Sequence, residues 1–321
     1  MKKYLGLALI GVIPIAALAA TAVEPPGWAY MVATPGTDER LSDPTVYTRP
    51  GSDLATTQAV IQNPFSPPDW YPNEHPPLPR AVEFGRPPLV QACMRCHLPN
   101  GGGHPESAYL AGLSASYIIQ QMRDFKSGAR VGLGEGRAAR SFNMVEIAGA
   151  ATDEEIAAAA EYFAGLPPIK WTRVVEADVI PESYIPPGVV MRFVKPGGGT
   201  EPVGRRIVEV PENTLGADLR DSHTSFIAYV PVGSIAKGRE LVTTGGGKTF
   251  QCAICHGPGL QGLADVPSIA GRSPAYMARQ LVDIKHGVRA GSAAALMNAV
   301  VENLTEEDMM NIVAYVASLD P

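Results

Sequence analysis

The chain has 321 residues, of which 45% are hydrophobic and 18% are charged, a composition typical of globular proteins rather than disordered or coiled-coil ones. Its net charge of −6 argues against nucleic acid as a partner, because that binding depends on clustered Lys and Arg side chains. The length suffices for two domains, but only 7% of the residues are aromatic, which is few for two cores packed by side chains alone.

The first 22 residues have the features of a secretory signal peptide. Lys2 and Lys3 precede an apolar run that ends near Ala19, and small residues suited to cleavage follow it. Pro14 interrupts this run, which is short for a membrane span of about 20 residues. An uncleaved membrane anchor is the alternative. We therefore expect residues 1–22 to be a cleaved signal peptide, and the mature chain to be exported with no membrane span.

Residues 23–81 are rich in proline. Proline pairs stand at 25–26, 67–68 and 76–77. Because proline fixes φ and removes a backbone donor, the segment is predicted to be an extended arm rather than a domain. The aromatic residues Phe65, Trp70 and Tyr71 favour packing of the arm onto one of the Cys-x-x-Cys-His modules described below or onto a partner, with a disordered tail as the alternative.

All four cysteines of the chain lie in two Cys-x-x-Cys-His motifs. These are Cys93-Met94-Arg95-Cys96-His97 and Cys252-Ala253-Ile254-Cys255-His256. The motif is typical of c-type haem attachment, since two thiols on one helical turn can add to the two vinyl groups of a porphyrin while the next residue offers imidazole to the iron. A redox-active Cys pair and half of a zinc site are the alternatives, but neither requires the His. We predict two haem c groups, with His97 and His256 as iron ligands.

The two motifs belong to a repeated unit. Residues 97–112 align without gaps on residues 256–271, and the alignment continues into two amphipathic stretches at 118–126 and 277–285. After a difference of six residues in length, Thr152-Asp-Glu-Glu matches Thr305-Glu-Glu-Asp.

Each unit is predicted to be mostly helical. A short helix carries the Cys-x-x-Cys-His motif, and a second helix runs near 115–127 or 274–286. A third helix begins at Thr152 or Thr305, where Thr152 and Glu155 form a capping box.

The repeat also indicates the second ligand of each iron. Met144 and Met297 occupy equivalent places, 47 and 41 residues after their histidines. Haem iron bound by His commonly takes Met on its other side, because the thioether raises the reduction potential. A core methionine that fills a packing gap is the alternative. We predict Met144 and Met297 as ligands, and hydrogen-bonding or surface roles for the remaining histidines, which are His75, His104, His223 and His286.

Residues 169–234, between the units, contain β-branched runs separated by Pro and Gly turns. The runs are 171–175, 189–194, 205–210 and 226–232. We predict a small β-rich insertion, either as a brace that sets the geometry of the two units or as a docking surface for a redox enzyme. The glycines at 245–247, followed by Lys248-Thr249, lack the spacing of a phosphate-binding loop and are predicted to form an ordinary loop.

The repeated motifs, the Leu-Ala-Gly and Ile-Ala-Gly loops, the paired methionines and the C-terminal Thr-Glu-Glu-Asp segment together resemble di-haem class I cytochromes of the cytochrome c4 type. The resemblance implies a mainly α protein with two tandem cytochrome c domains, at 82–168 and 235–321, joined by the insertion. It also implies transfer of single electrons in the periplasm, from a donor dehydrogenase or quinol-oxidising complex to an acceptor such as a terminal oxidase. The long arm and insertion depart from the family pattern.

Two other functions were weighed against an electron carrier. One is an electron-transfer subunit docked on a specific dehydrogenase, with the arm and insertion as docking elements. The other is a di-haem enzyme such as a peroxidase or a thiosulfate dehydrogenase, which needs an open iron position or an unusual ligand such as Cys. Because both units offer Met and all four cysteines are used for attachment, the carrier is favoured. Its acidic charge is expected to steer it to basic patches on partners, with rates that fall as salt rises.

Overall fold

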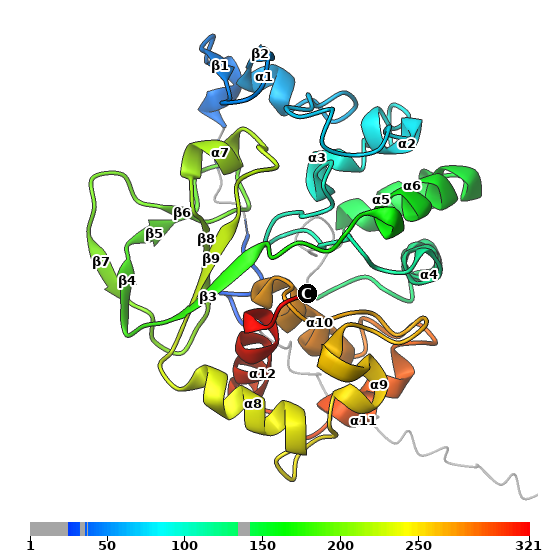
Figure 1. Ribbon diagram of the computed structural model, residues 1–321, viewed down its shortest axis with the longest axis vertical. Helices are drawn as coiled ribbons and strands as arrows, with labels where there is room; N and C mark the ends of the chain where they lie inside the picture. Colours follow the sequence, from blue (N-terminus) through cyan, green and yellow to red (C-terminus); the bar gives the residue numbers. More distant parts are fainter. Residues whose placement is uncertain (1–24, 33–35, 37, 134–141) are drawn as a thin grey trace, which may run out of the picture.

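The computed structural model describes residues 25–32, 36, 38–133 and 142–321, so the predicted signal peptide lies outside the described residues. We call residues 25–81 the arm, 82–168 the first module, 169–234 the insertion and 235–321 the second module. Helices form most of both modules, and the insertion supplies most of the strands (Figure 1). Within the described ranges, no helix is both long enough and apolar enough to span a bilayer.

The first module is built from four helices in the described part of the chain. They are α3 (Met94–His97), α4 (Ala115–Ser127), α5 (Phe142–Ala150) and α6 (Asp153–Gly165). The predicted helices at the Cys-x-x-Cys-His motif, at 115–127 and after Thr152 are all present. Helix α5, which carries Met144, was not predicted. Its nine residues are too few to show a clear helical period in the sequence.

The second module repeats this plan and adds one helix before its motif. Its elements are α8 (Ser234–Thr244), α9 (Ala253–His256), the 3₁₀ helix η3 (Pro258–Leu260), α10 (Pro274–Lys285), α11 (Ala295–Val301) and α12 (Glu306–Ser318). Neither α8 nor α11 was predicted. Helix α8 packs along α12, and the core of the module lies between these helices and α10.

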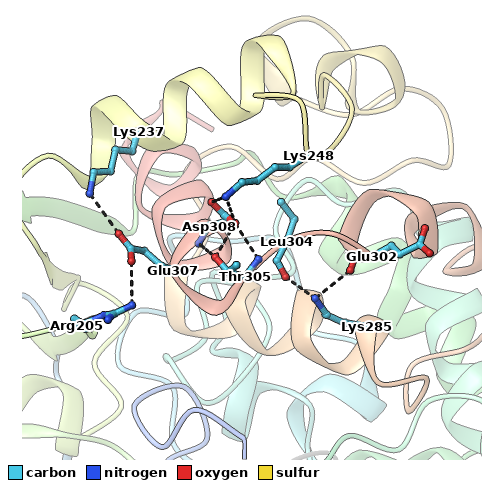
Figure 2. Close-up of polar contacts among 9 residues, drawn as sticks. All are labelled: Arg205, Lys237, Lys248, Lys285, Glu302, Leu304, Thr305, Glu307 and Asp308. Carbon is cyan, nitrogen blue, oxygen red and sulfur yellow. Dashed lines mark hydrogen bonds and ion pairs between the residues drawn. The ribbon is translucent and has the colours of Figure 1, made fainter.

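The last helix of each module begins in the same way. Thr152 caps α6 and Thr305 caps α12, each with a complete capping box. The acidic first turn of α12 is also tied to its surroundings (Figure 2): Glu307 pairs with Lys237 of α8 and with Arg205 of the insertion, and Asp308 pairs with Lys248.

A glycine in the same place in each module shows how closely the two are related. The N–H groups of Gly112 and Gly271 donate to carbonyls of the last helix, 3.2 and 3.0 Å away. Both glycines have positive φ, and a Cβ there would press on Pro168 or Pro321, which are themselves equivalent. The repeat seen in the sequence is therefore a repeat of backbone geometry.

The insertion contains three small sheets and one short helix. The largest sheet has the order β3-β9-β8, with β3 parallel and β8 antiparallel to β9. The elements are β3 (Thr172–Glu176), β4 (Val179–Pro181), β5 (Ser183–Tyr184), β6 (Phe193–Val194), β7 (Thr200–Pro202), β8 (Val208–Pro211), α7 (Thr214–Asp218) and β9 (Phe226–Val230). Three of the four predicted runs hold a strand of four or five residues, whereas only two residues of the run at 189–194 are in a strand.

The arm is more structured than the predicted extended chain. It contains η1 (Glu39–Ser42), a hairpin of β1 (Val46–Thr48) and β2 (Ala55–Thr57), α1 (Gln58–Ile61) and, at its end, α2 (Arg80–Glu83). Ile61, Trp70 and Tyr71 are buried around Leu219 of the insertion. Trp70 and Tyr71 are packed rather than part of a disordered tail, but they pack against the insertion and not, as was predicted, against a module or a partner.

Candidate haem sites

The two motif histidines have the same hydrogen bond. Nδ1 of His97 lies 2.7 Å from the carbonyl oxygen of Ala108, and Nδ1 of His256 lies 2.8 Å from that of Pro267. A carbonyl can only accept, so each imidazole donates from Nδ1 and keeps Nε2 free for a metal. Burial lowers the pKa of both histidines and favours the neutral form, which is the form that binds metal.

The thiols do not have the character of a redox-active Cys pair. Burial raises the pKa of Cys93 to about 12 and that of Cys252 to about 11, whereas a redox-active pair needs a low pKa at its attacking thiol. No group of three or more His, Cys, Asp or Glu side chains suited to a metal ion occurs among the described residues. The raised thiol pKa values weigh against the alternative of a redox-active pair.

A cavity of about 960 Å³ lies beside the first motif, with walls from the first module and from the arm, the insertion and the second module. Cys93, Cys96 and His97 line it together with Met144 of α5, so the predicted attachment and ligand residues of this module meet at one cavity. Its remaining walls include apolar side chains of α4 and α6, namely Ile118, Met122, Phe125, Ile156, Ala159 and Phe163. The volume is at the upper end of the range of about 300–1,000 Å³ for cofactor sites, and an apolar space between His and Met fits a haem.

In the second module, the structure places two of the predicted residues against the same core. Cys252 and Met297 both pack, partly buried, against the core around α10 and α12. Cys255 is exposed, whereas its counterpart Cys96 is half-buried.

Polar side chains from both modules form one wall of the cavity. Arg130, Tyr276, Arg279 and Gln280 supply donors there, as the carboxylates of a bound haem require. The guanidinium of Arg279 also donates to the carbonyls of Ala29 in the arm and Pro105 in the first module, at 2.8 and 2.7 Å.

The contact between the modules is approximately two-fold symmetric. Arg130 donates to the Tyr276 hydroxyl at 2.9 Å and to the side-chain oxygen of Gln280 at 2.8 Å. Arg289 donates to the Tyr117 hydroxyl and to the side-chain oxygen of Gln121, both at 3.0 Å. These residues are repeat partners, since Arg130, Tyr117 and Gln121 correspond to Arg289, Tyr276 and Gln280. The modules therefore meet through the same surface, used once by each.

His104 differs from its predicted surface or hydrogen-bonding role. Its side chain lines the cavity and is 4% exposed, yet neither ring nitrogen has a hydrogen-bond partner among the residues that the structure describes. Burial lowers the pKa of His104 to about 4, although the carboxylate of Glu106 lies 3.7 Å away.

The other histidines outside the motifs have the predicted hydrogen-bonding or surface roles. Nε2 of His75 lies 2.7 Å from the Asp69 carboxylate, and Nε2 of His223 lies 2.6 Å from that of Glu74. His286 caps the C-terminal end of α10.

Comparison with known proteins supports the interpretation of these sites. The family described as Cytochrome c matches residues 235–320. Cytochrome c-554(548) of Halomonas halodenitrificans is 37% identical over 87 residues, which are 27% of this chain and 96% of that protein. The chain belongs to the cytochrome c family.

Longer relatives match most of this cytochrome. Cytochrome c4 of Azotobacter vinelandii is 23% identical over 231 residues, covering 71% of this chain and 84% of that protein. The thiosulfate dehydrogenase electron acceptor of Thiomonas intermedia is 24% identical over 238 residues, covering 72% and 80%. Among solved structures, cytochrome c4 of Acidithiobacillus ferrooxidans has a TM-score of 0.47 and 21% identity, covering 71% and 98%. The chain is thus a cytochrome c4-like electron carrier with haem c as its cofactor.

Sequence reasoning missed the polar residues between the modules of this cytochrome. The signal was present, because the spacing that relates His97 to His256 also relates Arg130 to Arg289. Arg220 of the insertion was missed as well, and no repeat points to it. Its guanidinium donates to the carbonyl of Arg95, inside the first motif.

Proposed function

We propose that the protein is a periplasmic di-haem carrier that takes single electrons from a dehydrogenase or quinol-oxidising complex and gives them to an acceptor such as a terminal oxidase. Cys93 and Cys96 would attach the first haem, with His97 and Met144 as iron ligands. The second module would use Cys252, Cys255, His256 and Met297 in the same way. The haems supply a one-electron iron couple, and each domain of the proposal, 82–168 and 235–321, holds one.

The observation that carries the proposal is the pair of matching imidazole hydrogen bonds. His97 and His256 each donate from Nδ1 to a carbonyl of the loop that follows, which fixes the ring and presents Nε2. The same arrangement in both modules, each with an equivalent methionine, supports two bound haems rather than one.

One relative favours the alternative of a subunit docked on a dehydrogenase. The protein of Thiomonas intermedia named thiosulfate dehydrogenase electron acceptor matches 72% of this chain. Thiosulfate dehydrogenase is therefore our first candidate for the donor. A stable complex with such an enzyme, isolated from the native periplasm, would support the subunit over the free carrier.

The ligand assignment is tested by replacing each methionine. Met144→Ala and Met297→Ala are each expected to remove the near-infrared iron–sulfur band of one haem and to lower its reduction potential, because thioether ligation raises that potential. The matched controls are Met122→Ala and Met277→Ala, which shorten methionines of the same modules that are not proposed ligands. An unmutated protein with two haems by mass but no such band would refute the ligand pairs.

A further inference from the structure

We propose that redox proteins dock on the second module at an apolar surface formed by Phe250, Ile254, Leu263 and Leu296, because the arm and the insertion cover the corresponding face of the first module. This inference rests on the proposed function, since it concerns where the two modules can be approached by a partner. It goes beyond that function in stating that protein partners bind at the second module only.

The four apolar side chains are each more than half exposed. Phe250 is 58% exposed, Ile254 67%, Leu263 57% and Leu296 78%. All four lie close in the chain to residues predicted to hold the second haem: Ile254 lies between Cys252 and Cys255, Phe250 is two residues before Cys252, and Leu296 precedes Met297. Leu263 lies on the loop whose Pro267 carbonyl accepts the His256 hydrogen bond. Exposed large apolar side chains concentrated at one functional motif are typical of an interaction site.

The repeat shows what stands at the same four places in the first module. They are Gln91, Arg95, His104 and Asn143, none of which is apolar. His104 is 4% exposed where Leu263 is 57% exposed, and Asn143 alone of the four is exposed. The difference therefore lies in both residue type and accessibility.

The cover over the first module comes from two distant segments. Pro64 of the arm accepts a hydrogen bond from the N–H of Ala92, next to the first motif, at 2.9 Å. Arg220 of the insertion donates to the carbonyl of Arg95 and, at 2.9 Å, to the side chain of Gln62 in the arm. The ring of Phe226, in β9, meets His104 edge to face at 6.1 Å.

Further contacts fix this cover in place. The indole N–H of Trp70 donates to the carbonyl of Leu219 at 2.7 Å, and the side-chain amide of Asn100 donates to the backbone carbonyl of Ser222 at 2.8 Å. Arg49 pairs with the buried carboxylate of Asp221. Since the arm and insertion are bonded both to each other and to the first module, the covered face is closed in the folded protein rather than available to a partner.

The chemistry of the surface indicates the partner. None of its four side chains is charged, so a partner that packs closely there needs an apolar area of its own. Since electrons pass between the two proteins, that area is expected to surround the partner's one-electron cofactor. A second copy of this chain fits less well, because two molecules with a net charge of −6 repel each other. Long-range charge would govern the rate of encounter, while the apolar contact would govern how long the complex lasts.

The test uses the haem-loaded protein and a soluble mono-haem cytochrome c as the partner. Ile254→Asp and Leu296→Asp are expected to weaken binding at least about tenfold, which corresponds to about 1.4 kcal/mol. Leu89→Asp is the matched control: Leu89 is 55% exposed and lies four residues before the first motif, and its replacement is expected to leave the dissociation constant unchanged. In nuclear magnetic resonance titrations, amide shifts are expected on the second module.

Several outcomes would overturn the proposal. They are an equal loss of binding in Leu89→Asp, amide shifts centred on the arm or first module, and concentration-dependent self-association through the same surface. Absence of haem from the exported protein would instead refute the proposed function. Haem-loaded variants that bind the partner as tightly as the unmutated protein would refute the docking surface alone.

Discussion

Glu209 is a buried carboxyl group at the joint between the insertion and the second module. It is 3% exposed and lies on β8. One oxygen accepts from the Thr172 hydroxyl at 3.2 Å, and the other accepts from the Ser273 hydroxyl at 2.8 Å and the Ala275 N–H at 3.3 Å. These donors favour the charged form, as does the Arg279 guanidinium, but burial outweighs them and raises the pKa of Glu209 to about 7.

This shift predicts a loss of stability as pH rises. The pKa of Glu209 is higher in the folded than in the unfolded protein, so the folded state binds the proton more tightly between the two values. The free energy of unfolding should therefore fall from about pH 4.5 to about pH 7, by about 3 kcal/mol in total, and change no further above that.

Glu209→Gln isolates this contribution. The amide keeps an acceptor for Ser273 and can donate to the Thr172 hydroxyl, but it does not titrate. Denaturant unfolding of the haem-loaded protein is expected to show equal stability of the two proteins near pH 5 and a more stable variant near pH 8. The same pH dependence in both proteins would assign the effect to other groups.

Helices α8 and α12 pack in direct backbone contact, and a glycine makes this possible. Gly238 of α8 is buried, and a Cβ at this position would overlap the carbonyl of Asn311 in α12. The overlap is with backbone rather than with the end of a flexible side chain, so the helices would have to move apart.

Gly238→Ala should therefore destabilise the second module. The expected cost is about 1–3 kcal/mol, typical of overpacking, although alanine is the better helix former. Gly149→Ala in α5 is the matched control, since a Cβ there meets nothing within 4 Å and the same change should stabilise the protein by up to about 1 kcal/mol. Equal effects at the two sites, measured by denaturant unfolding, would exclude close packing as the cause.

At the scale of the whole molecule, features that occur in both modules could be predicted from the sequence, whereas the cover over the first module, which occurs once, could not. Cys-x-x-Cys-His is a local pattern, and Met144 was found because Met297 stands at the equivalent place. The cover over the first module has no such signal. It depends on pairs such as Trp70 with Leu219, which are 149 residues apart and have no counterpart in the second module. Contacts of this kind are decided by tertiary packing, so no periodicity in either segment reveals them.

The two-fold contact between the modules makes a prediction about cooperativity. Arg130 and Arg289 both donate to Gln121 and to Gln280, so the two guanidinium groups share their acceptors. Replacing either with Ala removes charged hydrogen bonds at a buried site, with an expected cost of about 1.5–3 kcal/mol. Because the acceptors are shared, either guanidinium alone still bonds both glutamines, and only the double replacement leaves their side-chain oxygens without these donors. The double replacement should therefore cost more than the sum of the two single ones, by about 0.5 kcal/mol or more.

A double-mutant cycle on the haem-loaded protein measures this coupling. The control cycle pairs Arg289→Ala with Arg205→Ala, whose guanidinium is 84% exposed and bonds to Glu307, away from the shared acceptors. That pair should be additive to within about 0.5 kcal/mol, since distant sites with no common partner act independently. If the pair formed by Arg130 and Arg289 is equally additive, the two sides of the contact stabilise the molecule separately. The symmetric network would then not act as one unit in holding the modules together.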